Sequence, residues 1–340
     1  MLYFAPLEGI TTYVYRNAFN RCFGGIDRYF SPFLTAKHIK GREKREVDPE
    51  NNADFKLVPQ ILTNKSDFFL AVAGQLEEMG YEEVNLNLGC PSGTVVSKKR
   101  GAGLLGDTLM LETFLDEIFE ASTVKISIKT RLGMESLYEW EDIYNIFVKY
   151  PASELIIHPR LGKEFYKGEV HLDSYIEAAR FYEKNKTTKL IYNGDINDIA
   201  SFRYIRETLG ENAPDTFMIG RGLLRNPTLA CTLKHYEDTE GRNSENDASE
   251  NEASGNDAPA DVVSDRTPDI ETFKKFHDEI FAGYIMEMNY EKQAVMKMKE
   301  LWSYMGEGLG ADKRLLKELY KAKTPAEYRN AFQMLISCLP

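Results

Sequence analysis

The sequence has no long apolar run. No stretch of about 18 or more consecutive apolar residues occurs in its 340 residues, so no membrane-spanning helix is expected. The opening residues, Met-Leu-Tyr-Phe-Ala-Pro, also lack the basic segment and apolar core of a signal peptide. We therefore expect a cytoplasmic protein.

Cysteine is scarce. The four cysteines, Cys22, Cys90, Cys231 and Cys338, are widely scattered and form no Cys-x-x-Cys pair. This spacing argues against a zinc ribbon, and we expect no metal site. In a cytoplasmic protein of this size, four free thiols are the expected state. We expect packing roles for all of them except Cys90.

An excess of positive charge is also missing. The chain has 42 Lys and Arg against 53 Asp and Glu, a formal net charge of −11. Proteins that bind nucleic acid usually carry a basic surface. However, residues 237–265 contain ten acidic residues and one basic residue, which leaves the remaining chain at −2. Any basic surface must therefore come from local clustering.

Short apolar runs rich in β-forming residues recur along the first two thirds of the chain, with amphipathic stretches between them. Strands that alternate with helices indicate parallel βαβ units. Eight such units within residues 1–235 predict a closed (β/α)8 TIM barrel, and a doubly wound open sheet is the alternative. The predicted strands are 2–5, 28–31, 56–60, 83–87, 125–129, 154–158, 189–192 and 216–219, and the predicted helices include 67–79, 109–121, 138–150, 172–184, 196–209 and 223–235.

The composition changes after the barrel. Residues 236–268 are rich in Glu, Asp, Asn, Ser and Ala, and they cannot bury enough apolar surface to offset the entropy of ordering. We interpret them as an acidic flexible linker. Helical periodicity returns in residues 269–340, over 273–288, 291–304, 314–322 and 325–335, and predicts a small all-α domain. Its basic residues form either a nucleic-acid surface or a solvated helix face: Lys292, Lys297, Lys299, Lys313 and Arg314.

Unusual residues follow nearly every predicted strand. In a (β/α)8 barrel the carboxyl ends of the strands surround the active site, so these residues predict a ring around one pocket. The ring comprises Pro6, Leu7 and Glu8, then Gln60, Asn87 to Cys90, Lys129 to Arg131, His158, Asn193 to Asp195, and Gly220 with Arg221.

The last two strand ends suggest a phosphate site. Loops after the seventh and eighth strands commonly bind phosphate in this fold, and glycine lets the backbone approach the anion. Asn193-Gly194-Asp195 and Gly220-Arg221 stand there, although these glycines can also serve only the βα turns. Lys129 at the end of a strand can stabilise negative charge on a cofactor ring, and its alternative is an ion pair.

Five strings in order resemble the tRNA-dihydrouridine synthases: Ala5-Pro6-Leu7-Glu8-Gly9, Asn87-Leu88-Gly89-Cys90-Pro91, Lys129-Thr130-Arg131-Leu132-Gly133, Tyr192-Asn193-Gly194-Asp195-Ile196 and Ile219-Gly220-Arg221-Gly222. The resemblance covers residues 1 to about 235, and Asn-x-Gly-Cys-Pro is its most discriminating string. It implies FMN in the barrel mouth, NADPH as reductant, and reduction of the C5–C6 bond of a tRNA uridine. The helical tail would then be a tRNA-binding domain.

The resemblance assigns roles residue by residue. Pro6, Leu7 and Glu8 would line the flavin, Gln60 would hydrogen-bond the isoalloxazine edge, Lys129 would face its N1/O2 side, and His158 would lie near flavin and uracil. The ribityl phosphate would be held by Asn193, Gly194, Asp195, Gly220 and Arg221. Contacts to the substrate RNA would come from Asn87, Lys98, Lys99, Arg100, Arg131 and Arg160.

Cys90 would be the general acid. Saturation of the uracil ring requires a hydride at C6, which reduced FMN delivers from N5, and a proton at C5. The donor must be protonated near neutral pH and still able to release its proton, which suits a thiol of pKa about 8.5. A buried small hydrophobic residue is the alternative for an isolated Cys-Pro pair.

Two segments need separate interpretation. The family commonly has His-Gly/Ala-Arg-Thr where this chain has His158-Pro159-Arg160-Leu161, and Lys163, Tyr166 and Lys167 follow, so the loop keeps groups that can contact RNA. Residues 101–106 match G-x-G-x-x-G, but they do not directly follow a strand, which argues against a dinucleotide site. The preceding Lys98-Lys99-Arg100 suits a phosphate-backbone contact or a solvated loop.

Two other functions compete with this interpretation. An FMN barrel reductase acting on a free pyrimidine, similar to dihydroorotate dehydrogenase, would share fold and cofactor, yet it would not need the helical domain or the basic loop at Lys98. An RNA-binding barrel that has lost catalysis is the other alternative, and the presence of Cys90, Lys129 and Arg221 argues against it.

Overall fold

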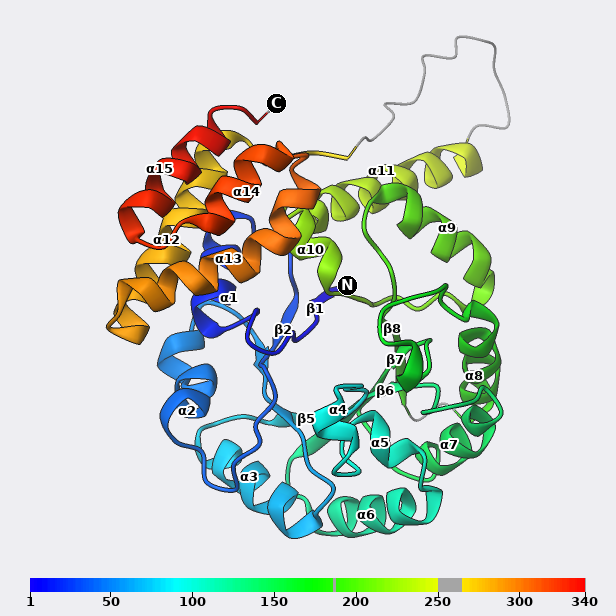
Figure 1. Cartoon of the computed structure of the whole chain (residues 1–340). Coiled ribbons are helices and arrows are strands. Elements are labelled where there is room, and N and C mark those ends of the chain that lie inside the picture. Colours follow the sequence, from blue (N-terminus) through cyan, green and yellow to red (C-terminus); the bar gives the residue numbers. More distant parts are fainter. Residues whose placement is uncertain (186–187, 250–264, 340) are drawn as a thin grey trace. The chain divides into compact units, whose positions relative to one another are not determined.

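The computed structural model of this protein describes residues 1–185, 188–249 and 265–339 (Figure 1). The chain divides into two compact units. The barrel unit comprises Met1–Asn17, Ile26–Asp195 and Ile205–Gly220, and the helical unit comprises Ala18–Gly25, Ile196–Tyr204 and Arg221–Pro340. The helical unit therefore includes segments well before residue 269, where the sequence predicted that the α domain begins.

The described part of the barrel unit contains one nine-stranded sheet, ordered β3-β2-β1-β9-β8-β7-β6-β5-β4. Every neighbouring pair is parallel. The strands are β1 Leu2–Phe4, β2 Arg28–Phe30, β3 Leu57–Val58, β4 Gln60–Ile61, β5 Glu83–Leu88, β6 Lys125–Arg131, β7 Glu154–His158, β8 Lys189–Tyr192 and β9 Phe217–Ile219.

The sheet closes at Pro59, because β3 and β4 are two halves of one barrel strand. Proline has no N–H and interrupts the ladder between them. Its carbonyl still accepts a hydrogen bond of 2.8 Å from the Asn85 amide. One half pairs with β2 and the other with β5. The predicted (β/α)8 barrel is confirmed, and all the predicted strand segments form strands.

Helices enclose the strands of this unit. Figure 1 shows α2, α3, α6, α7 and α8 around a central ring of strands. In α3, Phe69, Val72 and Leu76 are fully buried at helical spacing and form the face that packs inward. The helices wholly in this unit are α2 Gly41–Val47, α3 Ser66–Glu78, α4 Gly93–Val96, α5 Ala102–Leu105, α6 Thr108–Ala121, α7 Glu139–Phe147 and α8 Leu172–Asn185, with short 3-10 turns at Pro49–Asn52, Gly162–Glu164 and Gly210–Asn212. Helices α1 Tyr13–Cys22 and α9 Ile199–Leu209 are divided between the two units.

The interior of the barrel is apolar on one side and polar on the other. The apolar cluster combines Tyr3, Ala5, Phe30, Val58, Ile156, Ile191 and Met218. On β4 to β6, three polar side chains that lie side by side in the register, Gln60, Asn85 and Ser127, are fully buried. The amide of Asn85 accepts from Gln60 Nε2 at 2.8 Å and donates to Ser127 Oγ at 3.0 Å. Because each buried polar group is paired, this ladder is compatible with a packed core.

The helical unit contains α10 Arg221–Arg225, α11 Leu229–Ser249, α12 Ile270–Met288, α13 Glu291–Gly308, α14 Lys313–Lys321 and α15 Pro325–Ile336. The predicted single helix over residues 223–235 is wrong, because the chain leaves the helix at Asn226 and Pro227 before α11 begins. The four predicted tail helices are confirmed. Helix α11 continues to Ser249 and so covers the first part of the predicted linker, while residues 250–264 lie outside the described residues.

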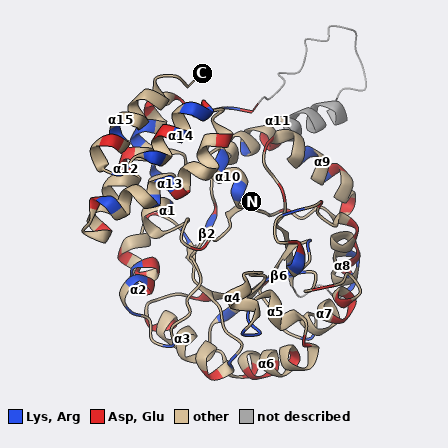
Figure 2. Cartoon of the chain, in the orientation of Figure 1, with Lys and Arg blue, Asp and Glu red and all other residues tan. Residues whose placement is uncertain are grey.

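Among the described residues, no helix combines the length and the apolar character needed to span a membrane. Figure 2 shows acidic and basic residues mixed along the outer helices of the barrel unit, and a short basic stretch beside α4. That stretch is Lys98-Lys99-Arg100. Local clustering, rather than net charge, therefore provides the basic groups of this unit.

Candidate functional site

The parallel register brings the predicted site residues to one end of the barrel. Asn87 pairs with Lys129 across β5 and β6, and Arg131 pairs with His158 across β6 and β7. Gly89 and Cys90 follow β5 directly. Since all strands run in the same direction, these residues and the segments that follow β1, β8 and β9 share the carboxyl end of the barrel.

Asn87 shapes the loop that carries Cys90. Its Oδ1 accepts the backbone N–H groups of Gly89 and Cys90 at 3.1 and 2.9 Å. Its Nδ2 donates to Gln60 Oε1 at 2.7 Å. Gln60 is fully buried, and its own Nε2 is held by Asn85. The buried amide ladder therefore orients the Cys90 backbone, while direct contacts of Asn87 with RNA and of Gln60 with flavin stay predictions.

Gly101 supports Cys90 from the other side. The Cys90 carbonyl accepts the Ala102 N–H at 3.0 Å. A Cβ at Gly101 would lie 2.7 Å from the Cys90 carbonyl oxygen, and its φ of +55° is unfavourable for other residues. Gly101 thus serves close packing against Cys90, and Gly103 of the same string lets the chain pack against the Val96 backbone, where a Cβ would lie 2.8 Å from the carbonyl oxygen. This explains the string without a nucleotide.

The environment of Cys90 keeps its thiol protonated. Burial raises the pKa of Cys90 above its ordinary value, and the nearby Glu8 carboxylate acts in the same direction. The Ser92 backbone N–H and the cations of Arg131 and Lys129 oppose this shift, but burial is the larger effect. A partly buried thiol that remains protonated at neutral pH can act as a proton donor.

Lys129 presents a cation at the same strand ends. Among the described residues its ammonium has no hydrogen-bond or ion-pair partner, so the alternative of a carboxylate pair is not observed. Burial, together with the Arg131 guanidinium, lowers the pKa of Lys129 to about 7. An unpaired lysine of this kind would gain a strong interaction from a ligand that carries negative charge.

Arg131 and Arg160 have protein partners. Arg131 is 1% exposed, and its three guanidinium nitrogens donate to the carbonyls of Gly89, Leu161 and Phe165 at 2.9, 2.8 and 2.6 Å. Arg160 is 0% exposed and pairs with Asp195 at 2.5 Å. This geometry favours positioning roles over the RNA contacts that we expected.

The two predicted phosphate glycines differ. A Cβ at Gly194 would lie 2.1 Å from the Tyr192 hydroxyl, so the protein itself requires glycine there. At Gly220 the nearest atoms would be Ala5 Cβ at 3.4 Å and a Leu7 Cδ at 3.6 Å, which are ordinary contacts. The packing of the protein therefore does not require glycine at position 220, and the absence of a side chain there leaves the backbone open to a ligand. Asn193 donates to the Met218 carbonyl at 2.7 Å, and Arg221 is the first residue of α10.

The remaining predicted residues have the following surroundings. The ring of His158 lies 3.3 Å from Arg160 Nη1 and is nearly buried. The Leu7 N–H donates to the Thr11 hydroxyl oxygen at 2.9 Å, and Arg42 Nη2 lies 3.5 Å from the Glu8 carboxylate. Pro6, which precedes Leu7 after the end of β1, is half-buried. Lys98 is exposed, Lys99 pairs with Asp107 at 2.9 Å, and Arg100 is half-buried.

The basic residues of the helical unit are only partly available to a ligand. Lys299 donates to the Ala322 carbonyl at the end of α14, and Lys297 and Arg314 pair with Glu300 and Asp312. Lys292 and Lys313 are exposed.

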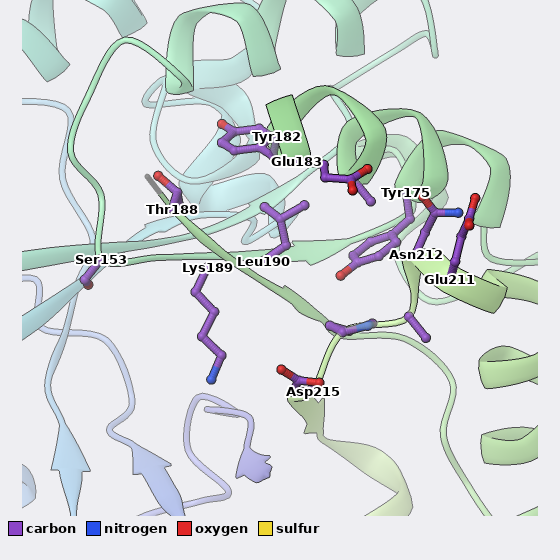
Figure 3. A pocket seen from close by; sticks show the side chains of 13 residues that line it. Ser153, Tyr175, Tyr182, Glu183, Thr188, Lys189, Leu190, Glu211, Asn212 and Asp215 are labelled. Atoms are coloured by element: carbon purple, nitrogen blue, oxygen red, sulfur yellow. The ribbon is translucent and has the colours of Figure 1, made fainter. Parts of the chain in front are cut away.

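A separate cavity of about 690 Å³ lies at the opposite end of the barrel (Figure 3). It is bordered by Ser153, Lys189 and Asp215, which precede or begin β7, β8 and β9, and by Tyr175 and Tyr182 of α8. The amino-terminal face of such barrels serves stability rather than catalysis. No described group of three or more His, Cys, Asp or Glu side chains could hold a metal ion.

The sequence did not indicate the roles of three residues. In the sequence, Gly101 belongs to a string that resembles a nucleotide motif, Arg131 resembles an RNA-binding residue, and Phe165 belongs to none of the motifs. Their contacts depend on backbone carbonyls from distant loops, which leave no spacing pattern in the sequence.

This chain is similar to a known protein family over most of its length. A family model described as "Dihydrouridine synthase (Dus)" matches residues 3–325. A protein of Staphylococcus aureus named "Probable tRNA-dihydrouridine synthase" is 30% identical over 237 residues, covering 66% of this chain and 68% of that protein. One of Bacillus subtilis, named "Probable tRNA-dihydrouridine synthase 2", is 27% identical over 228 residues, covering 66% and 69%. The chain belongs to the dihydrouridine synthase family.

Proposed function

We propose that this protein reduces the C5–C6 bond of uridine in tRNA, with FMN as cofactor and NADPH as reductant. The observation that carries the proposal is Cys90. Its thiol stays protonated through burial, and Asn87 and Gly101 hold its loop at the end of the barrel where Lys129 also lies.

The residues at this end of the barrel fit a flavin phosphate. The unpaired Lys129 ammonium suits the anionic side of a reduced flavin ring, and the bare backbone at Gly220 suits close approach of a phosphate. Pro6, Leu7, Glu8, Gln60, His158, Asn193, Gly194 and Asp195 stay the further candidates for this site, and Arg221 stays a sequence-based candidate. When bound, FMN supplies the hydride that C6 of the uracil accepts.

The protein supplies the proton. Cys90 donates its thiol proton to C5 and becomes a thiolate, which recovers a proton from solvent. The positive charges of Arg131 and Lys129 stabilise that thiolate, because both lower the pKa of Cys90. Burial therefore keeps the Cys90 thiol protonated before the reaction, and the two cations ease the release of its proton during the reaction.

RNA contacts would come from exposed basic residues. On the barrel unit, Lys98 and the loop residues Lys163 and Lys167 are exposed, and on the helical unit Lys292 and Lys313 are exposed. Lysine neutralises phosphates without reading sequence. We propose residues 269–340 as a tRNA-binding region on this basis.

Two measurements test the proposal. Purified protein should be yellow, and heat should release FMN; colourless protein that cannot be loaded with flavin would contradict it. The loaded enzyme should then oxidise NADPH in the presence of tRNA that lacks dihydrouridine, with dihydrouridine formed in the product. Activity on orotate or free uracil in place of tRNA would support the free-pyrimidine reductase instead.

A further inference from the structure

A strained turn follows the 3-10 turn after β7. The Lys167 N–H donates to the Glu164 carbonyl at 2.9 Å and closes a four-residue β-turn. Phe165 occupies its second position with φ +53° and ψ −102°. These angles correspond to the corner of a type II′ turn, which glycine strongly prefers. A bulky aromatic residue at this corner therefore stores backbone strain.

Buried contacts hold the turn in this conformation. Arg131 donates to the carbonyls of Leu161 and Phe165. The Glu164 carboxylate accepts the Leu161 N–H at 2.7 Å and contacts His171 Nε2 at 2.9 Å. Strain of this kind persists only where the surroundings over-determine the backbone, and it is concentrated at functional sites.

The ring of Phe165 gains little from folding. Phe165 is 47% exposed, and the adjacent Tyr166 is 49% exposed. Strained backbone with a buried ring would be explained by packing. Here the strained residue instead carries a half-exposed aromatic ring. Packing within the chain therefore does not account for the strained backbone.

The turn lies next to the Cys90 loop. The guanidinium that holds the Phe165 carbonyl through Nη2 also holds the Gly89 carbonyl through Nε, so two hydrogen bonds connect Phe165 with the residue before Cys90. Exposed lysines flank the aromatic pair at Lys163 and Lys167. Aromatic rings interleaved with cations are typical of surfaces that bind unpaired nucleic acid.

We infer that Phe165 is a stacking platform for a nucleobase adjacent to the uridine that is reduced. A uridine that reaches Cys90 must leave its stack, which uncovers the face of a neighbouring base. The Phe165 ring covers that face, and Lys163 and Lys167 contact the flanking phosphates. The inference rests on the proposed function, because it requires an RNA substrate at Cys90.

Three substitutions distinguish the contribution of the Phe165 ring to tRNA binding from that of the turn conformation. Phe165→Gly removes the ring and relieves the positive φ, so this variant should fold at least as well as the wild type. Phe165→Trp keeps an aromatic face. Tyr204→Ala removes a ring that is 63% exposed on α9 and is the matched control.

Binding of fluorescently labelled, unmodified tRNA is measured by anisotropy, together with steady-state kinetics in which tRNA and NADPH are varied in turn. Loss of one base–aromatic stack, about 1–3 kcal/mol, corresponds to a roughly 5- to 150-fold weaker Kd in Phe165→Gly. The KM for tRNA should rise with it. Phe165→Trp and Tyr204→Ala should bind like the wild type, and NADPH should reduce the flavin at an unchanged rate in all of them.

Wild-type tRNA affinity in Phe165→Gly overturns the inference. A raised KM for NADPH with unchanged tRNA affinity also overturns it, because the ring would then stack on the nicotinamide. Failure of the proposed function gives a different result: the wild type would bind tRNA without forming dihydrouridine, and the binding comparison among the variants would still decide the role of Phe165.

Discussion

The backbone N–H of Cys90 donates a 2.9 Å hydrogen bond to the side-chain oxygen of Asn87, three residues earlier near the end of β5. The strand end and the thiol are therefore one structural unit. Asn87 is in turn held by Gln60, so the barrel interior orients the proposed proton donor. Chemistry at this end of the barrel therefore depends on these two amide side chains as well as on the thiol.

Replacement of Cys90 should separate the two half-reactions. In Cys90→Ala, NADPH should reduce the bound flavin at a near-normal rate, because hydride entry needs no thiol. Reoxidation by tRNA should slow by about 10²–10⁴-fold, the usual contribution of a positioned general acid. Stopped-flow flavin absorbance measures both rates. Equal loss of both half-reactions, or of neither, would show that Cys90 is not the donor.

The pH dependence of reoxidation should follow the Cys90 thiol. Because burial raises the pKa of Cys90, the protonated form that donates persists above the ordinary thiol pKa of about 8.5. The tRNA-dependent rate should therefore stay constant through neutral pH and fall only in the alkaline range above that value. A rate that falls below pH 8 would contradict this assignment. Reduction by NADPH provides the internal control.

The two phosphate-loop glycines should respond differently to alanine. Gly220→Ala makes only ordinary contacts within the protein, so the melting temperature of the apoprotein should not change. FMN affinity should fall by about 10- to 150-fold, the equivalent of one charge-assisted hydrogen bond of about 1.5–3 kcal/mol. Gly194→Ala meets the Tyr192 hydroxyl and should lower the melting temperature itself. Unchanged FMN affinity in Gly220→Ala would remove Gly220 from the phosphate site.

Binding of FMN to the apoprotein should take up protons through Lys129. With a pKa of about 7, this lysine is partly neutral at neutral pH, and an anionic ligand raises that pKa. Proton uptake should be larger at pH 8 than at pH 6, and it should disappear in Lys129→Met. Calorimetry in buffers with different ionisation enthalpies measures it. Equal uptake in Lys129→Met would place the titrating group elsewhere.

His277 should make the helical unit sensitive to acid. It is buried, stacks on Phe332 at a centroid distance of 3.5 Å, and its Nε2 lies 2.8 Å from the Tyr328 hydroxyl oxygen. Burial lowers its pKa below 6.5, although Asp278 opposes the shift. The unfolded chain therefore binds the proton more readily, so the stabilising contribution is complete above about pH 6.5 and is lost as the pH falls below it.

Thermal unfolding at pH 7.5 and pH 5.5 measures this effect. The loss of melting temperature between the two values should be smaller in His277→Gln, which does not titrate, even if that variant is less stable at both. His38 is exposed, and His38→Gln should keep the wild-type dependence. An identical pH dependence in wild type and His277→Gln would contradict the prediction.

The alternation of apolar runs and amphipathic stretches was sufficient to predict the barrel, because parallel strands at this spacing have few other ways to pack. The strand boundaries at Glu154–His158 and Lys189–Tyr192 followed from the same pattern. The position of the candidate site residues was predictable for a related reason, since the ends of parallel strands must meet at one end of a barrel. The split of one strand at Pro59 and the break between α10 and α11 at Pro227 required the structure.

The sequence by itself determined which residues lie at the active end of this protein, because strand direction alone places Cys90, Lys129 and Gly220 there. Only the tertiary structure decided how they are used. Arg131 and Arg160 looked like groups for RNA, but burial turned their guanidinium groups toward carbonyls and a carboxylate of distant loops. Gly101 and Phe165 acquired their roles from a close backbone approach and from a positive φ. Such contacts join residues far apart in the chain, so no local spacing encodes them.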